Sequence, residues 1–244
     1  MSGNEPQYRE THGPTRVLLS WSGGKDSALA LHRLRSDPAV TVAGLITTVT
    51  ASYDRVSTHG VRRSLLHEQA ASLGLPLHEI ELPPSPTNEQ YQAAWRAALG
   101  ALPATLRAAR CIAFGDIALE DVRAYREALV GALGCVAIFP LWGEPPDAIV
   151  DEVLGLGFAA TLVCVDTQAL PAAYAGRSYD ASLLDELPPG VDPCGEGGEF
   201  HTFVYDGPGF ATRVRFETGD TVIRDDRFAF CDLVPVGAPG EQRP

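Results

Sequence analysis

The stretch that most constrains the fold of this 244-residue chain is Ser22-Gly23-Gly24-Lys25-Asp26-Ser27. It follows a short apolar run, Val17-Leu18-Leu19, and precedes residues 28–34, whose apolar spacing is helical. A strand therefore runs into a glycine turn, and the turn opens a helix. Unpaired backbone N–H groups and the positive end of the helix dipole meet at such a turn and favour an anion. The two glycines let the backbone approach a phosphate closely.

Polar side chains of the turn can complete a nucleotide site. Lys25 adds a positive charge, Ser22 and Ser27 add hydroxyl donors, and Asp26 can hold a hydrated Mg²⁺ ion. The spacing is not that of a Walker A loop, which needs glycine where Leu19 stands and serine or threonine where Asp26 stands. The alternative is a plain glycine turn with a surface lysine. The strand–turn–helix context favours phosphate binding.

Strand and helix signals alternate over the first part of the chain. Strands are expected at residues 16–20, 40–49, 77–82, 111–114 and 136–139, and helices at residues 26–35, 61–73, 87–102 and 119–133. Five strands separated by helices predict an α/β fold with a doubly wound, parallel, five-stranded sheet. Ligands of such sheets bind beyond the carboxyl ends of the strands, where the glycine turn and Asp116 fall. Asp116 could contact Mg²⁺ or a ribose there, or it could cap a helix.

The pattern changes after Pro140. A helix at 147–156, a strand at 158–165, a loop-rich stretch and three strand-like runs at 202–205, 211–217 and 228–234 predict a smaller α+β C-terminal subdomain. The expected boundaries are a disordered leader at 1–15, a domain with the glycine turn at 16–140, a smaller subdomain at 141–236 and a tail at 237–244.

A second unusual stretch is Cys194-Gly195-Glu196-Gly197-Gly198-Glu199-Phe200. A solvated surface loop is one interpretation, but bulky Phe200 and Phe203 favour a packed loop that holds both glutamates in place. A held pair of carboxylates can bind Mg²⁺, orient an amine or ammonium ion, or serve as a base. Glu196 and Glu199 are therefore candidate catalytic residues.

The turn SGGKDS resembles the pyrophosphate loop of the adenine nucleotide alpha hydrolase superfamily, whose members split ATP between the α and β phosphates. The resemblance implies ATP and Mg²⁺ as cofactors, catalytic roles for Lys25 and Asp26, and Mg²⁺ held by Asp26 and Asp116. The nucleotide-binding residues expected from it are Ser20, Ser22, Gly23, Gly24, Lys25, Asp26, Ser27, Ile46, Thr47 and Asp116.

Three further stretches narrow the resemblance. CGEGGEFHTFVYDGP resembles the signature of the diphthine–ammonia ligase family, and Gly115-Asp116-Ile117 and Pro140-Leu141-Trp142-Gly143 resemble two more of its elements. The family implies a ligase that adenylates a carboxylate, releases pyrophosphate and forms an amide with ammonia or an amine. A nucleotide sensor without turnover, or an ATP pyrophosphatase acting on another small molecule, stays open. Residues 58–63 resemble bacterial members, which favours an acceptor other than diphthine.

Composition limits the partners. The net charge of −12 argues against nucleic acid, and no apolar run reaches the ~18 residues that span a bilayer. The N-terminus lacks the apolar core of a signal peptide, and the five cysteines form no CxxC pair, so a reduced, cytoplasmic protein is expected. The expected partners are a small-molecule or protein-borne carboxylate and ammonia, with no nucleic acid and no membrane. A homodimer stays open.

Overall fold

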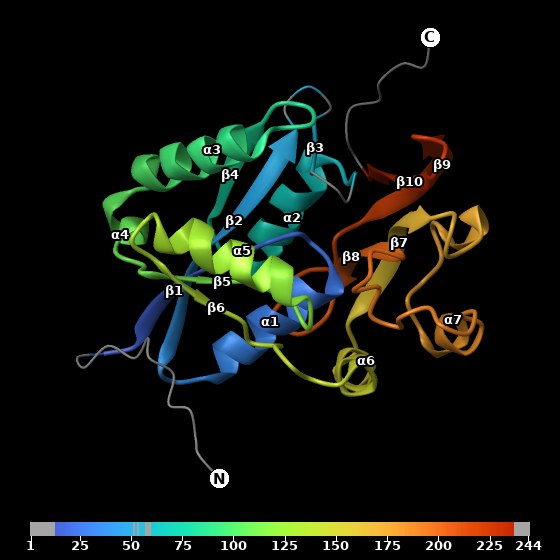
Figure 1. Ribbon diagram of the computed structural model, residues 1–244. Helices are drawn as coiled ribbons and strands as arrows, with labels where there is room; N and C mark the ends of the chain where they lie inside the picture. The colour runs from blue at the N-terminus through green and yellow to red at the C-terminus, as the bar shows by residue number, and fades with distance from the viewer. Residues whose placement is uncertain (1–12, 51, 53, 57–59, 237–244) are drawn as a thin grey trace.

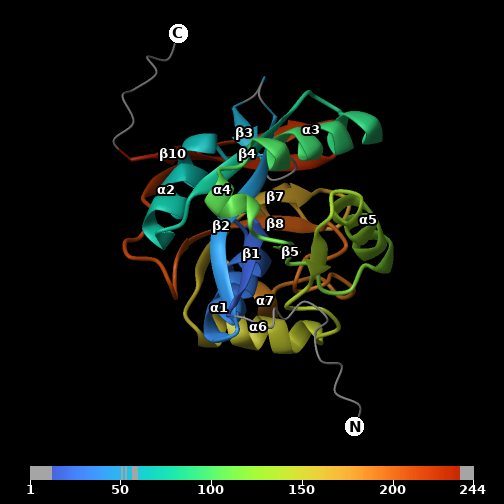
Figure 2. The same ribbon diagram turned by 90° about the vertical axis from the view of Figure 1, so that its left-hand side faces the viewer.

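A computed structural model describes residues 13–50, 52, 54–56 and 60–236. Two sheets lie side by side, with helices between and around them (Figures 1 and 2). The expected leader and tail fall outside the described residues, apart from residues 13–15, and so do residues 58 and 59 of the 58–63 stretch. In the described part of the chain, no helix combines the length and the apolar character that crossing a bilayer requires.

The first sheet confirms the doubly wound α/β prediction. Its five parallel strands have the spatial order β4-β2-β1-β5-β6. The strands are β1 (Thr15–Ser20), β2 (Val40–Thr50), β4 (Leu77–Leu82), β5 (Cys111–Ala113) and β6 (Val136–Ile138). A sixth strand, β3 (Arg55–Val56), pairs antiparallel with the end of β2 and was not predicted, because two residues carry no periodicity. The strand order reverses between β1 and β5, where sheets of this kind bind ligands.

Helices cover both faces of this sheet. Leu29 of α1 (Lys25–Ser36) and Leu66 of α2 (Arg63–Leu73) pack in one apolar cluster. Trp95 of α3 (Asn88–Ala101) and Val130 of α5 (Glu120–Gly131) pack in another. Figures 1 and 2 accordingly show α3 and α5 on one side of the strands and α1 on the other. The short helix α4 (Ala104–Arg107) leads into β5.

The second sheet confirms the smaller α+β part. It is antiparallel, with the order β8-β7-β10-β9. Helix α6 (Pro146–Gly155) precedes it, and a 3₁₀ turn (Ala172–Tyr174) and helix α7 (Ala181–Asp185) lie between its first two strands along the chain. The strands are β7 (Ala159–Asp166), β8 (Phe200–Asp206), β9 (Phe216–Arg224) and β10 (Phe228–Pro235).

One strand prediction in this sheet is wrong. The strand expected at 211–217 lies instead at 216–224, as β9. Asp225 and Asp226 both have positive φ, 52° and 50°, and form the tight turn that joins β9 to β10. Such a turn sets the register of a hairpin, so the residues directly before it pair with β10.

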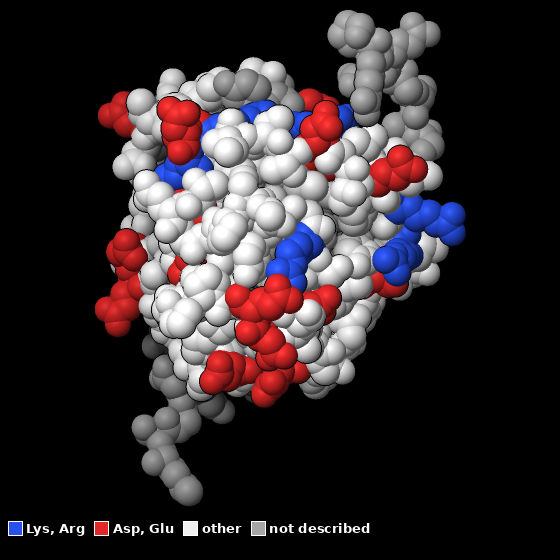
Figure 3. Space-filling model, turned by 90° about the vertical axis from the view of Figure 1, so that its right-hand side faces the viewer, with Lys and Arg blue, Asp and Glu red and all other residues white. Residues whose placement is uncertain are grey.

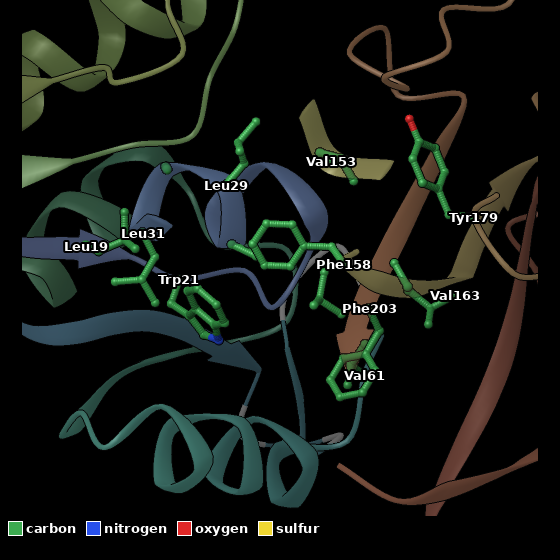
Figure 4. Packing of buried hydrophobic residues seen from close by; sticks show 14 of the residues in the cluster. Leu19, Trp21, Leu29, Leu31, Val61, Val153, Phe158, Val163, Tyr179 and Phe203 are labelled. Carbon is green, nitrogen blue, oxygen red and sulfur yellow. The ribbon is translucent and has the colours of Figure 1, made fainter. Parts of the chain in front are cut away.

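A single apolar core joins the two sheets. Leu19 and Trp21 at the end of β1, Leu29 of α1, and Phe158 and Phe203 of the C-terminal part belong to one buried cluster (Figure 4). Helix α1 therefore lies between the sheets and buries side chains against both. On the outer face shown in Figure 3, a group of aspartate and glutamate side chains gathers, in keeping with the acidic composition.

Candidate active site

A cavity of about 570 Å³ opens at the carboxyl ends of β1, β2 and β5 and reaches the Cys194–Phe200 loop. Most of the predicted site residues line this cavity, and three of them do not. Those on the wall are Ser20, Ser22, Gly24, Lys25, Asp26, Ser27, Thr47, Asp116 and Glu196. Those outside the lining are Gly23, Ile46 and Glu199. Ile46 is buried in the core, and only its carbonyl meets the turn, accepting from the N–H of Trp21 at 2.8 Å.

Hydrogen bonds within the glycine turn hold its shape. Gly23 has a φ of +82°, a conformation that favours glycine, and Gly24 is the N-cap of α1. The N–H of Gly24 donates to Ser22 Oγ at 3.3 Å, and Ser22 Oγ donates to Ser27 Oγ at 3.2 Å. Ser27 Oγ in turn donates to the carbonyl of Gly24 at 2.9 Å. The turn thus presents a helix N-terminus and two hydroxyls to the cavity.

Gln69 of α2 supports the turn from below, although sequence reasoning missed it. Its side chain is fully buried. Gln69 Nε2 donates to the carbonyls of Gly23 at 3.0 Å and Val204 at 2.5 Å, and its Oε1 accepts from Trp21 Nε1 at 2.8 Å. A Cβ on Gly23 would lie 2.8 Å from Gln69 Oε1, so this position requires glycine for space as well as for φ. A single glutamine on a helix belongs to no sequence motif, so the sequence does not indicate this contact.

Strand β8 meets the turn directly. The N–H of Lys25 donates to Thr202 Oγ1 at 3.1 Å, and the N–H of Val204 donates to the carbonyl of Gly23 at 2.8 Å. A Cβ on Gly24 would lie 3.1 Å from the carbonyl oxygen of Thr202. The C-terminal sheet therefore packs against one side of the glycine turn.

The side chain of Lys25 is 1% exposed. Its ammonium group donates to both carboxylate oxygens of Asp26, at 2.8 and 3.0 Å, and to the carbonyl of Cys194. It also lies 5.7 Å from the ring centre of Tyr179 and 5.9 Å from that of Phe200. The role of Lys25 as a phosphate ligand stays a prediction.

Asp116 follows β5 and faces the cavity with an arginine that the sequence analysis did not single out. Arg126 Nε of α5 lies 2.6 Å from Asp116 Oδ2, and the guanidinium group of Arg126 stacks 4.6 Å from the ring centre of Phe114. The preceding Gly115 lies against the start of α1, where a Cβ would come within 3.0 Å of the Asp26 backbone. This contact brings Asp116 and Asp26 to the same cavity.

The two candidate glutamates have different surroundings. Glu196 Oε1 accepts from the N–H groups of Ile117 at 2.9 Å and Ala118 at 3.0 Å, and Glu196 lines the cavity. Burial raises the pKa of Glu196, and the charges of Asp26 and Asp116 raise it further. Glu199 accepts from the N–H of Asp192 at 3.4 Å, and its Oε2 is buried without a hydrogen-bond partner among the described residues. Glu196 therefore faces the cavity, whereas Glu199 lies outside its lining, and the catalytic role of each stays a prediction.

His201 of β8 is a further cavity residue outside the predicted set. Burial lowers its pKa to about 4, and the charge of Lys25 contributes in the same direction. The imidazole is therefore neutral at pH 7. A neutral imidazole beside carboxylates can accept a proton or a hydrogen bond from a ligand.

The described residues offer no cluster of three or more histidine, cysteine or acidic side chains arranged to hold a metal ion. Asp26 and Asp116 nevertheless fit a Mg²⁺ ion that arrives with a polyphosphate, since this ion usually takes one or two carboxylates together with phosphate oxygens and water. Both line the cavity, and the side chain of Asp26 is 30% exposed. Each is paired with a cation, Lys25 or Arg126.

Two family models together match this chain over most of its length. Residues 15–136 match the family model of the diphthamide synthase N-terminal domain, and residues 145–232 match that of the diphthamide synthase C-terminal domain. A diphthine–ammonia ligase of Danio rerio is 33% identical over 132 residues, which are 52% of this chain and 50% of the relative. The match with this curated relative thus spans about half the relative's length.

Proposed function

This chain belongs to the diphthamide synthase family, and we propose that it is an ATP-dependent ligase that adenylates a carboxylate and amidates it with ammonia or an amine. One observation carries the proposal. A glycine turn built for phosphate and a held carboxylate, Glu196, face the same cavity although they are far apart in the sequence.

The first step concerns the glycine turn. A substrate carboxylate oxygen attacks the α phosphorus of ATP. The bond between that phosphorus and the oxygen that bridges the α and β phosphates breaks, and pyrophosphate leaves. The N-terminus of α1 and the hydroxyls of Ser22 and Ser27 face the cavity and would stabilise the charge on the leaving group. Asp26 and Asp116 would hold a Mg²⁺ ion, whose chemistry is to neutralise phosphate charge.

The second step concerns the opposite wall. Ammonia attacks the carbonyl carbon of the acyl adenylate, AMP leaves, and the nitrogen loses a proton. The carboxyl group of Glu196, held by the Ile117 and Ala118 N–H groups, would orient the nitrogen nucleophile. Neutral His201 stands on the same cavity wall as a group that can accept the released proton.

Two alternatives make different demands on the site. A nucleotide sensor needs the glycine turn but no second wall, whereas here Glu196 is anchored by two backbone donors. An ATP pyrophosphatase that acts on another small molecule would release AMP without using ammonia. The Danio rerio relative is a diphthine–ammonia ligase, and this similarity favours amide formation.

The test is product analysis with ATP labelled at the α phosphate, over a panel of carboxylic acids, with and without ammonium. We expect AMP and pyrophosphate, with ammonium-dependent amide formation for one class of acid. Glu196→Gln should lower amide formation ~100-fold or more while ATP affinity stays close to that of the wild type. Glu217→Gln, at an exposed position of β9, is the matched control. ADP as the main product would overturn the reaction class, and AMP formation that ignores ammonium would support the pyrophosphatase alternative.

A further inference from the structure

The chain contains a single lysine, Lys25, beside 18 arginines. This lysine stands at the first position of α1, where sequence reasoning expects a charge for phosphate. It is 1% exposed, which is rare for a lysine. The one position at which this arginine-rich chain uses lysine is therefore a buried position inside the candidate site.

The partners of the Lys25 ammonium come from two parts of the fold. Asp26 belongs to α1, whereas Cys194 belongs to the loop that carries Glu196. The rings of Tyr179 and Phe200, also from the C-terminal part, flank the charge at cation–π distances. The ammonium group thus joins the glycine turn to the Cys194–Phe200 loop.

A lysine suits this position better than an arginine. An ammonium group is a compact charge with three donors, whereas a guanidinium group is a wide planar fork with five. The two Asp26 oxygens and the Cys194 carbonyl provide acceptors for the ammonium donors. Turning the ammonium group toward a phosphate would leave the Cys194 carbonyl without this donor in the interior, which is unfavourable.

We infer that Lys25 is a positioning residue: through the Cys194 carbonyl it holds the Cys194–Phe200 loop against the glycine turn and so sets where Glu196 stands. Glu196 lies two residues beyond Cys194 and is held on its other side by Ile117 and Ala118. Removing the ammonium group releases the attachment of Cys194 to the glycine turn and leaves those to Ile117 and Ala118 and from the N–H of Asp166 to the carbonyl of Glu199. The inference concerns the cavity of the proposed function and depends on that proposal only for the choice of ligand.

The first experiment uses the single lysine. Protein labelled with [¹⁵N]lysine has one side-chain ammonium group to observe by NMR, that of Lys25. Inorganic pyrophosphate and ATP, each without Mg²⁺, are then titrated into the intact protein. We expect the ammonium signal to keep its chemical shift and its protection from solvent exchange when either ligand binds. A large shift on saturation would mean that the ammonium group moves to phosphate, and it would overturn the inference.

The second experiment removes the charge. In ligand-free Lys25→Met protein, we expect hydrogen exchange of the backbone amides of residues 194–200 to rise at least tenfold, about 1.4 kcal/mol of lost protection. Pyrophosphate affinity should stay within about threefold of the wild type. Arg35→Met is the matched control, because Arg35 lies on the same helix and donates to the carbonyl of Leu73, away from this loop. It should leave exchange at residues 194–200 unchanged.

Each further outcome decides the inference. A roughly 30-fold loss of pyrophosphate affinity with unchanged loop exchange would assign Lys25 to phosphate and overturn the positioning role. If Lys25→Met does not fold, Lys25→Gln, which keeps a neutral donor, and the wild-type NMR titration still decide between the two roles. If wild-type protein binds neither pyrophosphate nor ATP, the proposed function fails, while the ligand-free exchange comparison still tests the attachment of the loop.

Discussion

Glu196 and Glu199 lie three residues apart, and their surroundings nevertheless differ. The first accepts from two backbone N–H groups at the cavity, and the second packs beneath Gly197 with one buried oxygen. The sequence predicts a catalytic role for both, and both roles stay predictions, because spacing alone does not say which way each side chain turns. At the scale of single residues, the protonation of Glu196 and of His201 can be tested directly.

Replacing Glu196 by glutamine should make stability depend less on pH. Burial raises the pKa of Glu196, so the folded protein holds this proton to a higher pH than the unfolded chain does. Stability from this group is present below its ordinary pKa of 4.5 and is lost as the pH rises through that value toward the raised pKa. The free energy of unfolding of Glu196→Gln, relative to wild type, should therefore increase from pH 4 to pH 7. Urea denaturation over this range measures it, and a constant difference would contradict the prediction.

The contribution of His201 to stability should depend on pH in the opposite direction. Burial lowers its pKa from 6.5 to about 4, so the unfolded chain binds the proton first as the pH falls. Stability is present above pH 6.5 and is lost toward pH 4. His201→Asn should remove up to about 3 kcal/mol of this loss. NMR titration of the imidazole signals, with the His201 signal identified by its absence in the variant, checks the pKa. A titration midpoint near pH 6.5 would contradict the lowered pKa of the buried imidazole.

At the scale of elements, the approach of β5 to α1 can be tested at Gly115. A Cβ there would come within 3.0 Å of the Asp26 backbone. Gly115→Ala should therefore force β5 away from the start of α1, destabilise the fold by about 1–3 kcal/mol and weaken ATP binding. Gly100→Ala is the control, because Gly100 lies in α3 with open space around it, and alanine should stabilise that helix by about 1 kcal/mol. Equal effects of the two changes on thermal unfolding and ATP titration would refute the contact.

The elements that were predictable are those with long periodic patterns. Helix α3 begins where Thr87 and Gln90 indicate, and the structure shows them in a reciprocal capping box. The glycine turn is recognisable because a strand, two glycines and a helix follow one another within the sequence. The strand before the Asp225-Asp226 turn was misplaced, since the pairing of β9 depends on that turn rather than on apolar spacing.

The rest of the site depends on contacts between distant segments. Gln69 and Arg126 stand alone on helices, and only the folded chain shows that one braces the glycine turn and the other pairs with Asp116. Ile46 is expected at the nucleotide from the family resemblance, and this stays a prediction; its side chain lies in the core, while the neighbouring Thr47 lines the cavity. Which of two neighbouring strand residues faces a cavity depends on the register, and the apolar run of β2 does not show it.

At the scale of the whole molecule, the shared core predicts that both sheets unfold together. Phe203 of β8 is fully buried in the cluster that also contains Leu19 and Leu29. Phe203→Ala should cost about 3–5 kcal/mol and lower the protection of β1 and β2 as much as that of β7 and β10. Hydrogen exchange at increasing urea concentration measures each strand. The shared core would be refuted if β7 and β10 lost protection while β1 and β2 kept theirs.

Strand β8 carries Thr202, which touches the glycine turn, next to Phe203, which fills the core. The packing at Phe203 and the contact made by Thr202 are therefore coupled through one strand. A core substitution that shifts β8 also displaces the hydroxyl group of Thr202, which accepts from the N–H of Lys25. The shape of the cavity would then change before any residue of its wall had been replaced. Substitutions in the core can therefore alter the cavity as much as substitutions in its wall.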